Sequence, residues 1–403
     1  MSGLSSTVPA ATDQSLWRLP AMRQLVLISL LGFSSFCLTL AAVPSWAHAG
    51  GVAEAAAGLP TTVMLASTVL TQALVPRLVA RFGTGRTLAA GLVALGAPAP
   101  FLALSHELAV LLPLAAARGC GFAVLTVVGA TLTATVAPAG RHGESVGLYG
   151  LAVAVPNLLG IPGGVALTQA GGFGWVAALA ASPLLAVPLA LALGRAARGE
   201  RHGPPAAASA AQPRRDRPVR AALPASLVLF VVTLAGGGLI TFLPIERPSG
   251  LVATGGLLLF GASSAVSRWR VGAVADRLGA RRLLPGFVLA AVIGVALVAA
   301  GLSIGPAANV LVLVLVGALV AGAGYGAVQN LTLVVAFAQA GPSRTATASA
   351  VWNAAFDAGT GLGAVVIGAG AATGLGVPAA FGFSAALIVC SLPLVRWMRP
   401  REN

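Results

Sequence analysis

Two charged side chains lie within long apolar stretches, and they are the residues of this sequence best suited to chemistry. Arg118 falls in the stretch 108–136 and Asp357 in the stretch 347–371. A charge at the centre of a membrane helix costs about 2.5–3.5 kcal/mol, so each side chain should face a partner or a cavity. A carboxyl group removed from water can exchange a proton, and a guanidinium group can bind an anion. Both are therefore candidates for proton coupling or substrate binding, and a structural bond to neighbouring helices is the alternative for each.

Other kinds of chemistry find no support in the sequence. The chain contains no Lys, so it has no Lys-bearing phosphate loop, and it shows neither a His-rich zinc signature nor a Ser nucleophile elbow. Cys37, Cys120 and Cys390 lie in separate apolar stretches, and we interpret them as small buried side chains. The sequence thus predicts no enzyme activity, no cofactor and no metal site.

The elements that must position the two charges follow from composition. Of 403 residues, 57% are hydrophobic and 8% charged, whereas soluble domains carry about 25% charged residues. Together with a mean hydropathy of +0.93, these values exclude a soluble fold and a disordered chain. Apolar stretches long enough to cross a membrane occur six times on each side of one Arg-rich segment. We predict an all-α integral membrane protein with twelve transmembrane helices.

The Arg-rich segment, with Ala and Pro in its middle, is predicted to be a cytoplasmic linker between two halves of similar length. The predicted segments are a cytoplasmic tail at 1–22, a six-helix bundle at 23–194, the linker at 195–220, a second six-helix bundle at 221–396 and a cytoplasmic tail at 397–403.

The distribution of Arg residues predicts the orientation in the membrane. With the N-terminus in the cytoplasm, 22 of the 24 Arg residues fall in cytoplasmic segments, Arg268 and Arg270 among them. Because positive charge favours the cytoplasmic side, both termini should be cytoplasmic, as in a multi-pass protein of the inner membrane. The net charge of +14 then reflects topology and attraction to anionic lipid headgroups, and nucleic acid is not an expected partner.

The two halves repeat one another in the same order. The turn 81–86 matches the turn 277–282 at an offset of 196, and 119–122 matches 322–325 at an offset of 203. Parallel six-helix repeats are one plan of alternating-access transporters, in which the substrate site lies between the halves.

The turn after the eighth predicted span carries a family signature of Gly, Asp-Arg, Gly and Arg-Arg. On these residues the chain resembles the major facilitator superfamily, which implies a cytoplasmic latch between helices. The latch residues are Gly272, Asp276, Arg277, Gly279, Arg281 and Arg282. The first-half copy keeps Arg81, Gly83 and Arg86 but has Pro76 and Ala80 where Gly and Asp are expected. The resemblance therefore implies that Asp276 contributes more to transport than Ala80.

Two further elements resemble those of exporters, and the first is similar to the branch that contains drug and sugar efflux permeases of the arabinose type. One runs from Arg118 to Phe122 in the fourth span and continues in the loop and helix that follow. The other is a displaced version of the Gly/Pro-rich element of antiporters, which would bend or closely pack its helix. Its residues are Gly160, Pro162, Gly163 and Gly164.

In the superfamily, the first, fourth, seventh and tenth spans line the cavity, which implies lining residues beside the two charges. The candidates, with two Asn residues of the fifth and eleventh spans, are Ser34, Ser35, Thr39, Thr233, Thr241, Tyr325, Gln329, Asn330, Asn157 and Asn353. Gln329 and Asn330 are adjacent and point about 100° apart on a helix, so one of them should face the cavity.

The resemblance implies a monomeric secondary transporter that moves a small molecule by alternating access. We expect export of a drug-like or hydrophobic metabolite in exchange for protons, with Arg118 and Asp357 as coupling residues. The main alternative is a proton-linked importer of a sugar or organic anion, in which Arg118 would bind the anion. A membrane enzyme or sensor is a more remote alternative, because the sequence has neither a soluble domain nor a His/Asp/Glu cluster.

Overall fold

The computed structural model describes residues 16–136, 142–199, 217–248, 250–303, 308–340 and 345–398. All regular elements in these ranges are helical. The α-helices are α1 (Pro20–Leu40), α2 (Ala42–Ala49), α3 (Glu54–Ala57), α4 (Leu59–Gln72), α5 (Val75–Phe82), α6 (Thr84–Gly96), α7 (Leu108–Val136), α8 (His142–Gln169), α9 (Phe173–Leu179), α10 (Val187–Gly199), α11 (Arg217–Glu246), α12 (Gly250–Leu278), α13 (Ala280–Ser303), α14 (Ala308–Ala340), α15 (Thr345–Ala371) and α16 (Gly376–Trp397). Three short 3₁₀ helices accompany them: η1 (Leu16–Arg18), η2 (Ala99–Leu104) and η3 (Ser182–Ala186).

Within the described ranges these helices supply the predicted spans. Eleven segments are long and apolar enough to cross a membrane, and the bent pair Glu54–Gln72 and Val75–Phe82 brings the number to twelve. The two parts of this pair meet at 57°. The bend has a local cause, because Pro76 lacks the N–H group that would continue the helix of α4.

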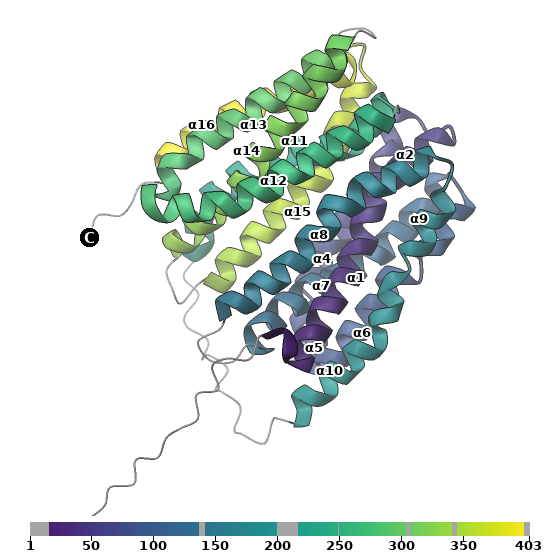
Figure 1. Cartoon of the computed structure of the whole chain (residues 1–403), viewed down its shortest axis with the longest axis vertical. Coiled ribbons are helices and arrows are strands. Elements are labelled where there is room, and N and C mark those ends of the chain that lie inside the picture. The colour runs from purple at the N-terminus through teal and green to yellow at the C-terminus, as the bar shows by residue number, and fades with distance from the viewer. Residues whose placement is uncertain are drawn as a thin grey trace, which may run out of the picture.

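The spans form two bundles, one of α1 to α10 and one of α11 to α16. Figure 1 shows the first in purple to teal and the second in green to yellow, with α8 and α12 side by side between them. A large cluster of buried apolar side chains contains residues of both bundles.

Matching glycines show that the bundles are parallel repeats. Gly83 and Gly279 follow equivalent helices and have φ values of 84° and 86°, a conformation that other residues adopt only with strain. Gly119 lies against the Met64 carbonyl oxygen and the Ser67 hydroxyl, while its counterpart Gly322 lies against the equivalent groups of Phe260 and Ser263. The same close helix approach therefore occurs once in each bundle.

Contacts between the bundles gather at one end and along two helix pairs. The helix α15 packs on α3 and α4, α8 packs on α12, and α2 packs on α11. The opposite end of the bent span, α5, has α4, α6 and α7 of its own bundle as its main neighbours. The bundles are thus joined most extensively at the end that carries α2 and α3.

The helices α10 and α11 extend over the two ends of the predicted linker, and residues 200–216 lie outside the described ranges. Two predicted details differ from the structure. Cys37 is buried as predicted, but Cys120 and Cys390 are exposed. Apolar surface that faces lipid has the same sequence character as apolar surface in the protein interior, which explains the wrong interpretation.

Candidate functional site

Arg118 lies near the middle of α7 and points into its own bundle. One guanidinium nitrogen, Nη2, donates to the carbonyl oxygen of Ser35 at 3.1 Å, to the Ser35 hydroxyl at 3.3 Å and to the Thr39 hydroxyl at 2.8 Å. Both acceptor residues are on α1, one helical turn apart. Phe122, one turn after Arg118, stacks on Phe36 at a ring distance of 4.1 Å. The polar contact and the aromatic contact together hold α7 against α1.

The Arg118 side chain is only 1% exposed, so this charge is sealed from solvent in the described conformation. The second terminal nitrogen, Nη1, is buried and has no hydrogen-bond partner among the described residues. No described carboxylate pairs with the guanidinium group, and hydroxyl and carbonyl oxygens supply its contacts. Such a cation retains the capacity to attract an anion or a carboxylate if the site opens.

Asp357 lies halfway along α15 and is bonded to the opposite bundle. The Gln72 side-chain nitrogen Nε2, at the end of α4, donates to Asp357 Oδ2 at 2.8 Å. A second bond between the same two helices runs from the Thr62 hydroxyl to the Gly361 carbonyl oxygen at 2.7 Å. We call this contact of α4 with α15 the seam. Asp357 is 8% exposed. The one acidic side chain found in the middle of a span thus takes part directly in the contact between bundles.

The helix α15 can reach both bundles because small residues cover two of its faces. Gly359 and Gly363 lie against the backbone of α11 in the same bundle. On a different face of α15, Gly361 and Ala364 lie against Leu65 and Gly58 of the other bundle. Asp357 belongs to this second face, since residues four and seven apart lie on one side of a helix. The Gly-rich sequence of the eleventh span therefore positions Asp357 at the seam.

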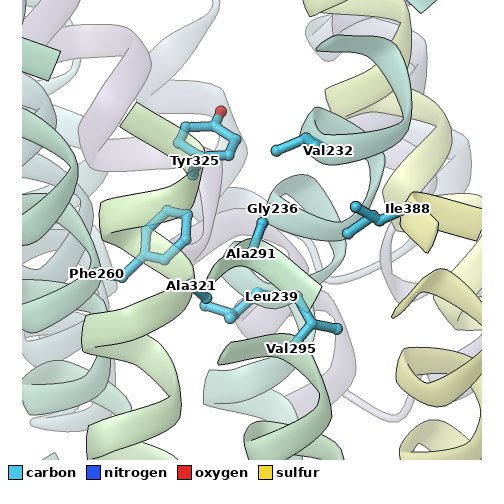
Figure 2. A pocket seen from close by; sticks show the side chains of 9 residues that line it. All are labelled: Val232, Gly236, Leu239, Phe260, Ala291, Val295, Ala321, Tyr325 and Ile388. Atoms are coloured by element: carbon cyan, nitrogen blue, oxygen red, sulfur yellow. The ribbon is translucent and has the colours of Figure 1, made fainter. Parts of the chain in front are cut away.

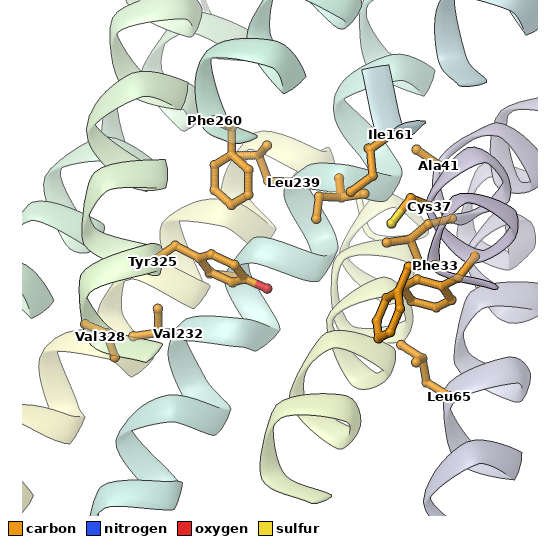
Figure 3. Close-up of a cluster of buried hydrophobic side chains, with 14 of the residues drawn as sticks. Phe33, Cys37, Ala41, Leu65, Ile161, Val232, Leu239, Phe260, Tyr325 and Val328 are labelled. Carbon is orange, nitrogen blue, oxygen red and sulfur yellow. The ribbon is translucent and has the colours of Figure 1, made fainter. Parts of the chain in front are cut away.

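Tyr325 of α14 extends the polar region around Asp357 within the second bundle. Its hydroxyl lies near the side chain of Thr360 on α15, and its ring packs at 5.0 Å from that of Phe260. Figure 3 shows the Tyr325 hydroxyl pointing away from α14, on the side where Phe33 of the first bundle lies. Tyr325 and Asp357 are thus connected through α15.

A small cavity lies on the other side of the Tyr325 ring. Figure 2 shows it between Phe260 and Tyr325 on one side and Val232 and Ile388 on the other. Its volume is about 10 Å³, no more than one water molecule needs, and its lining is mostly apolar. It is a packing gap within one bundle, too small for a substrate.

A charged residue that the sequence analysis placed in a cytoplasmic segment belongs to the same region. Arg268 falls within the span Leu251–Gly272, and Arg270 does so as well. The Arg268 atom Nη1 donates to Gln329 Oε1 at 3.0 Å, and Asn330 Nδ2 donates to the Arg268 carbonyl oxygen at 3.0 Å. Arg268 was missed because a charge near the end of an apolar stretch looks like part of the following loop. The long polar side chains of Gln329 and Asn330 were the available signal.

Comparison with known proteins agrees with this architecture. Residues 25–299 match the sequence profile of the Major Facilitator Superfamily, which is more than half of the chain. The chain belongs to this superfamily. Membership makes it a transporter of small molecules rather than an enzyme, as the resemblance implied. No protein of curated function matches the chain in sequence.

Solved structures of other superfamily transporters share the fold. A bacterial homologue of the human lysosomal transporter Spinster, in an inward-facing and occupied conformation, superposes with a TM-score of 0.71 at 16% identity, over 96% of this chain and 97% of the other. The nucleoside transporter NupG superposes with a TM-score of 0.70 at 13% identity, over 94% of this chain and 98% of the other. At such low identities these similarities establish the fold alone.

The remaining lining candidates of this superfamily member divide into two groups. Ser35, Thr39, Thr233 and Thr241 are buried, and the first three bond to backbone carbonyl groups inside their own bundle. The second group is partly or fully exposed and comprises Ser34, Asn157, Asn330 and Asn353. The adjacent residues Gln329 and Asn330 both contact Arg268, one through its side chain and one through its backbone, so the prediction of one cavity-facing residue stays open.

The latch motif is partly described. A Cβ atom placed on Gly272 would lie 3.5 Å from the side-chain nitrogen of Asn330. Gly279 makes the predicted tight turn. The side chain of Asp276 lies outside the described residues, so its bonds stay a prediction. Arg81, Arg86, Arg277 and Arg282 are exposed, as expected for a rim that interacts with water and lipid headgroups.

The Gly/Pro element of α8 has a packing role that the structure makes visible. Gly160 and Gly164, four residues apart, lie against Cys37 and the Leu38 carbonyl oxygen of α1. Gly163 faces open space, and Pro162 lies inside the helix between them. Small residues at this spacing let membrane helices approach closely.

Among the described residues, no group of three or more His, Cys, Asp or Glu side chains could hold a metal ion.

Proposed function

We propose that this chain is a proton-coupled secondary transporter of the inner membrane, which acts as a monomer and exports a small drug-like or hydrophobic molecule by alternating access. The observation that carries the proposal is the hydrogen bond between Gln72 and Asp357. It joins the two bundles through a group that can gain and lose a proton. A ligand shifts a conformational equilibrium only through different interactions in the two states, and this bond supplies such a difference.

The chemistry of the bond explains how a proton would act. A charged Asp357 carboxylate accepts strongly from the Gln72 amide, because hydrogen bonds to an ionised acceptor are about twice as strong as neutral ones. Protonation weakens this acceptor and adds an O–H donor that needs a new partner. Proton binding therefore loosens the seam on the α4 and α15 side, and proton release tightens it.

The distribution of contacts supports an inward-facing state. The Arg-rich turns before α6 and α13 lie at the end opposite α2 and α3, and the charge pattern assigns those turns to the cytoplasm. The bundles then meet at the extracellular end. Export is favoured over uptake by the Gly/Pro element of α8, which resembles that of exchange-type exporters.

A second candidate function is proton-linked import of an organic anion. It is favoured by one observation, the buried Arg118 nitrogen Nη1 that lacks a partner among the described residues. In this account an anion that reaches Arg118 would complete its hydrogen bonds and neutralise its charge.

Flux in vesicles separates these functions. Inverted and right-side-out membrane vesicles, loaded with a fluorescent pH indicator, would be exposed to a panel of lipophilic dyes, sugars and organic acids under an imposed proton gradient. Export by antiport predicts gradient-driven accumulation of a compound in inverted vesicles with proton release from their lumen. Accumulation with proton uptake in right-side-out vesicles instead would establish import. Gradient-independent accumulation in both would contradict proton coupling.

A further inference from the structure

We propose that the transported molecule carries an oxyanion, a carboxylate or phosphate group, and that Arg268 binds it in the space between α8 and α12. This inference deepens the proposed function by naming the substrate class of the transporter. It rests on the position of Arg268 in the fold, on the bonds that hold it and on the open space opposite it.

The position of Arg268 follows from helix geometry. Gly261, on the same helix, approaches the Asn157 carbonyl oxygen of α8 at 3.7 Å when a Cβ atom is placed on it. Arg268 is seven residues further along α12, which rotates it by about 20° and moves it about 10 Å along the axis. It therefore projects from the face of α12 that meets the first bundle. Val266 and Trp269, which are 56% and 73% exposed, mark the lipid-facing side instead.

The opposite helix leaves room at this level. The helices α8 and α12 run antiparallel, so the residue of α8 at the level of Arg268 lies seven positions before Asn157. This residue is Gly150, and no neighbouring atom lies within 4 Å of the place where its Cβ atom would be. The exposed residues Leu151 and Leu159 lie on another side of α8. The helices thus touch near Asn157 and leave open space beside Arg268.

The bonds of Arg268 fix its direction without neutralising its charge. Gln329 accepts one N–H of the guanidinium group, and Asn330 holds the backbone of α12 at the same point. A guanidinium group has five N–H donors, so four remain for a ligand. The Arg268 side chain is exposed, and no described carboxylate forms an ion pair with it. A planar cation held by a neutral acceptor and open on its other edge matches the two oxygens of a carboxylate or phosphate group.

Other charges nearby are consistent with an anionic ligand. Asp357 and Tyr325 lie in the same region of the second bundle, and Asp357 is bonded to Gln72 rather than to Arg268. Arg118 adds a second cation in the first bundle. Because Asp357 is bonded to Gln72, it is not paired with Arg268, and a substrate oxyanion would supply that partner.

Ligand binding to the purified full-length protein tests the inference without knowledge of the natural substrate. Thermal melting in detergent at constant ionic strength would be recorded with inorganic phosphate, glycerol phosphate, succinate and benzoate, and with the neutral partners glycerol, succinamide and benzamide. We expect at least one anion, and not its neutral partner, to raise the melting temperature. Arg268→Gln should weaken the binding of that anion by about tenfold or more, because hydrogen bonds to a charged group are lost.

Matched variants exclude a general effect of charge or folding. Arg270→Gln removes a neighbouring cation that stacks on Trp269 at 5.0 Å, and it should bind the anion like the wild type. Gly150→Leu fills the open space and should weaken anion binding although Arg268 is unchanged. Both variants and Arg268→Gln should melt like the wild type without ligand. A lower melting temperature of ligand-free Arg268→Gln together with an unchanged response to the anion would show that Arg268 has only a structural role, and it would overturn the proposal.

Two further arms separate the remaining outcomes. Melting in nanodiscs with and without phosphatidylglycerol shows whether a lipid headgroup is the anion; stabilisation by this lipid with no response to soluble anions would overturn the proposal. No response to any anion, or an equal response of Arg268→Gln and wild type, would overturn it as well. Gradient-driven flux measured in parallel keeps the proposed function distinct, because flux without anion binding contradicts only the substrate class, and anion binding without gradient-driven flux contradicts only proton coupling.

Discussion

Arg118 and Asp357 are both buried charges in the middle of their helices, but their bonds connect different parts of the molecule. The three contacts of Arg118 end on α1 of its own bundle, whereas the contact of Asp357 ends on α4 of the opposite bundle. A rocking motion that keeps each bundle rigid would leave the first set intact and would change the second. The comparison teaches that position relative to the seam, more than burial, distinguishes a group that senses conformation from one that stabilises a bundle.

The largest expected effect is at the seam. Asp357→Asn keeps a hydrogen-bonding side chain of the same size but cannot bind a proton, so gradient-driven flux in proteoliposomes should fall to the level of protein-free liposomes. The control Thr373→Ala, just after the same helix and bonded only to the nearby backbone of Gly370 and Leu375, should keep wild-type flux. Gradient-driven flux that survives in Asp357→Asn would remove this residue from coupling.

The next effect concerns the bundle-internal charge. Arg118→Gln loses three contacts to α1, each worth about 0.6 kcal/mol for an average bond between membrane helices, or about 2 kcal/mol together. Its thermal stability in detergent should fall accordingly. The pH dependence of its remaining flux should match that of the wild type, and a shifted pH profile would place Arg118 in the coupling step and break the comparison.

A smaller effect is expected at the partner of Asp357. Gln72→Leu removes the cross-bundle bond, and loss of about 0.6 kcal/mol changes the ratio of the two states by about threefold. Flux at limiting proton gradient reports this ratio. Thr71→Val, which alters a neighbouring residue bonded to Cys120 within the first bundle, should have no such effect, and equal behaviour of the two variants would argue against a role for the seam bond.

The smallest effect distinguishes the two latch copies. An exposed pair of a carboxylate and an Arg contributes about 0.2–1 kcal/mol, so the loss of such a latch pair in Asp276→Asn should lower the flux about twofold. Ala80→Asn, at the equivalent place in the first half, should leave it unchanged. Equal flux in Asp276→Asn and the wild type would mean that the sequence signature has lost its function in both halves.

Much of the architecture could be predicted from sequence because a bilayer imposes simple rules. Apolar length fixed the number of spans, and the low charged fraction isolated Arg118 and Asp357. The repeat was visible in the spacing of turns, and its glycines occupy equivalent places in the structure. These features depend on local composition, which a single sequence contains.

The site could be predicted only in part because its contacts join distant residues. Gln72 is 285 positions from Asp357, and nothing in the local sequence of α4 marks it as a partner. Arg268 lies close to a span end, where hydropathy cannot separate a membrane-embedded charge from a loop. Cys120 and Cys390 were assigned to the interior because lipid is as apolar as a protein core.

The central claim is that the protonation of Asp357 changes how the bundles meet, and a distance measurement tests it most directly. Spin labels at Arg86→Cys and Arg282→Cys, both exposed and placed in equivalent turns of the two halves, would report the separation of the bundles at their Arg-rich end. The exposed Cys120 and Cys390 would first be replaced by Ser.

The distributions of distances between the two spin labels would be recorded at low and at high pH, because a carboxyl group removed from water can exchange a proton. We predict that the distribution shifts between the two conditions in the otherwise wild-type protein, and that Asp357→Asn abolishes the shift and keeps the low-pH distribution throughout. A shift of the same size in Asp357→Asn would contradict the account.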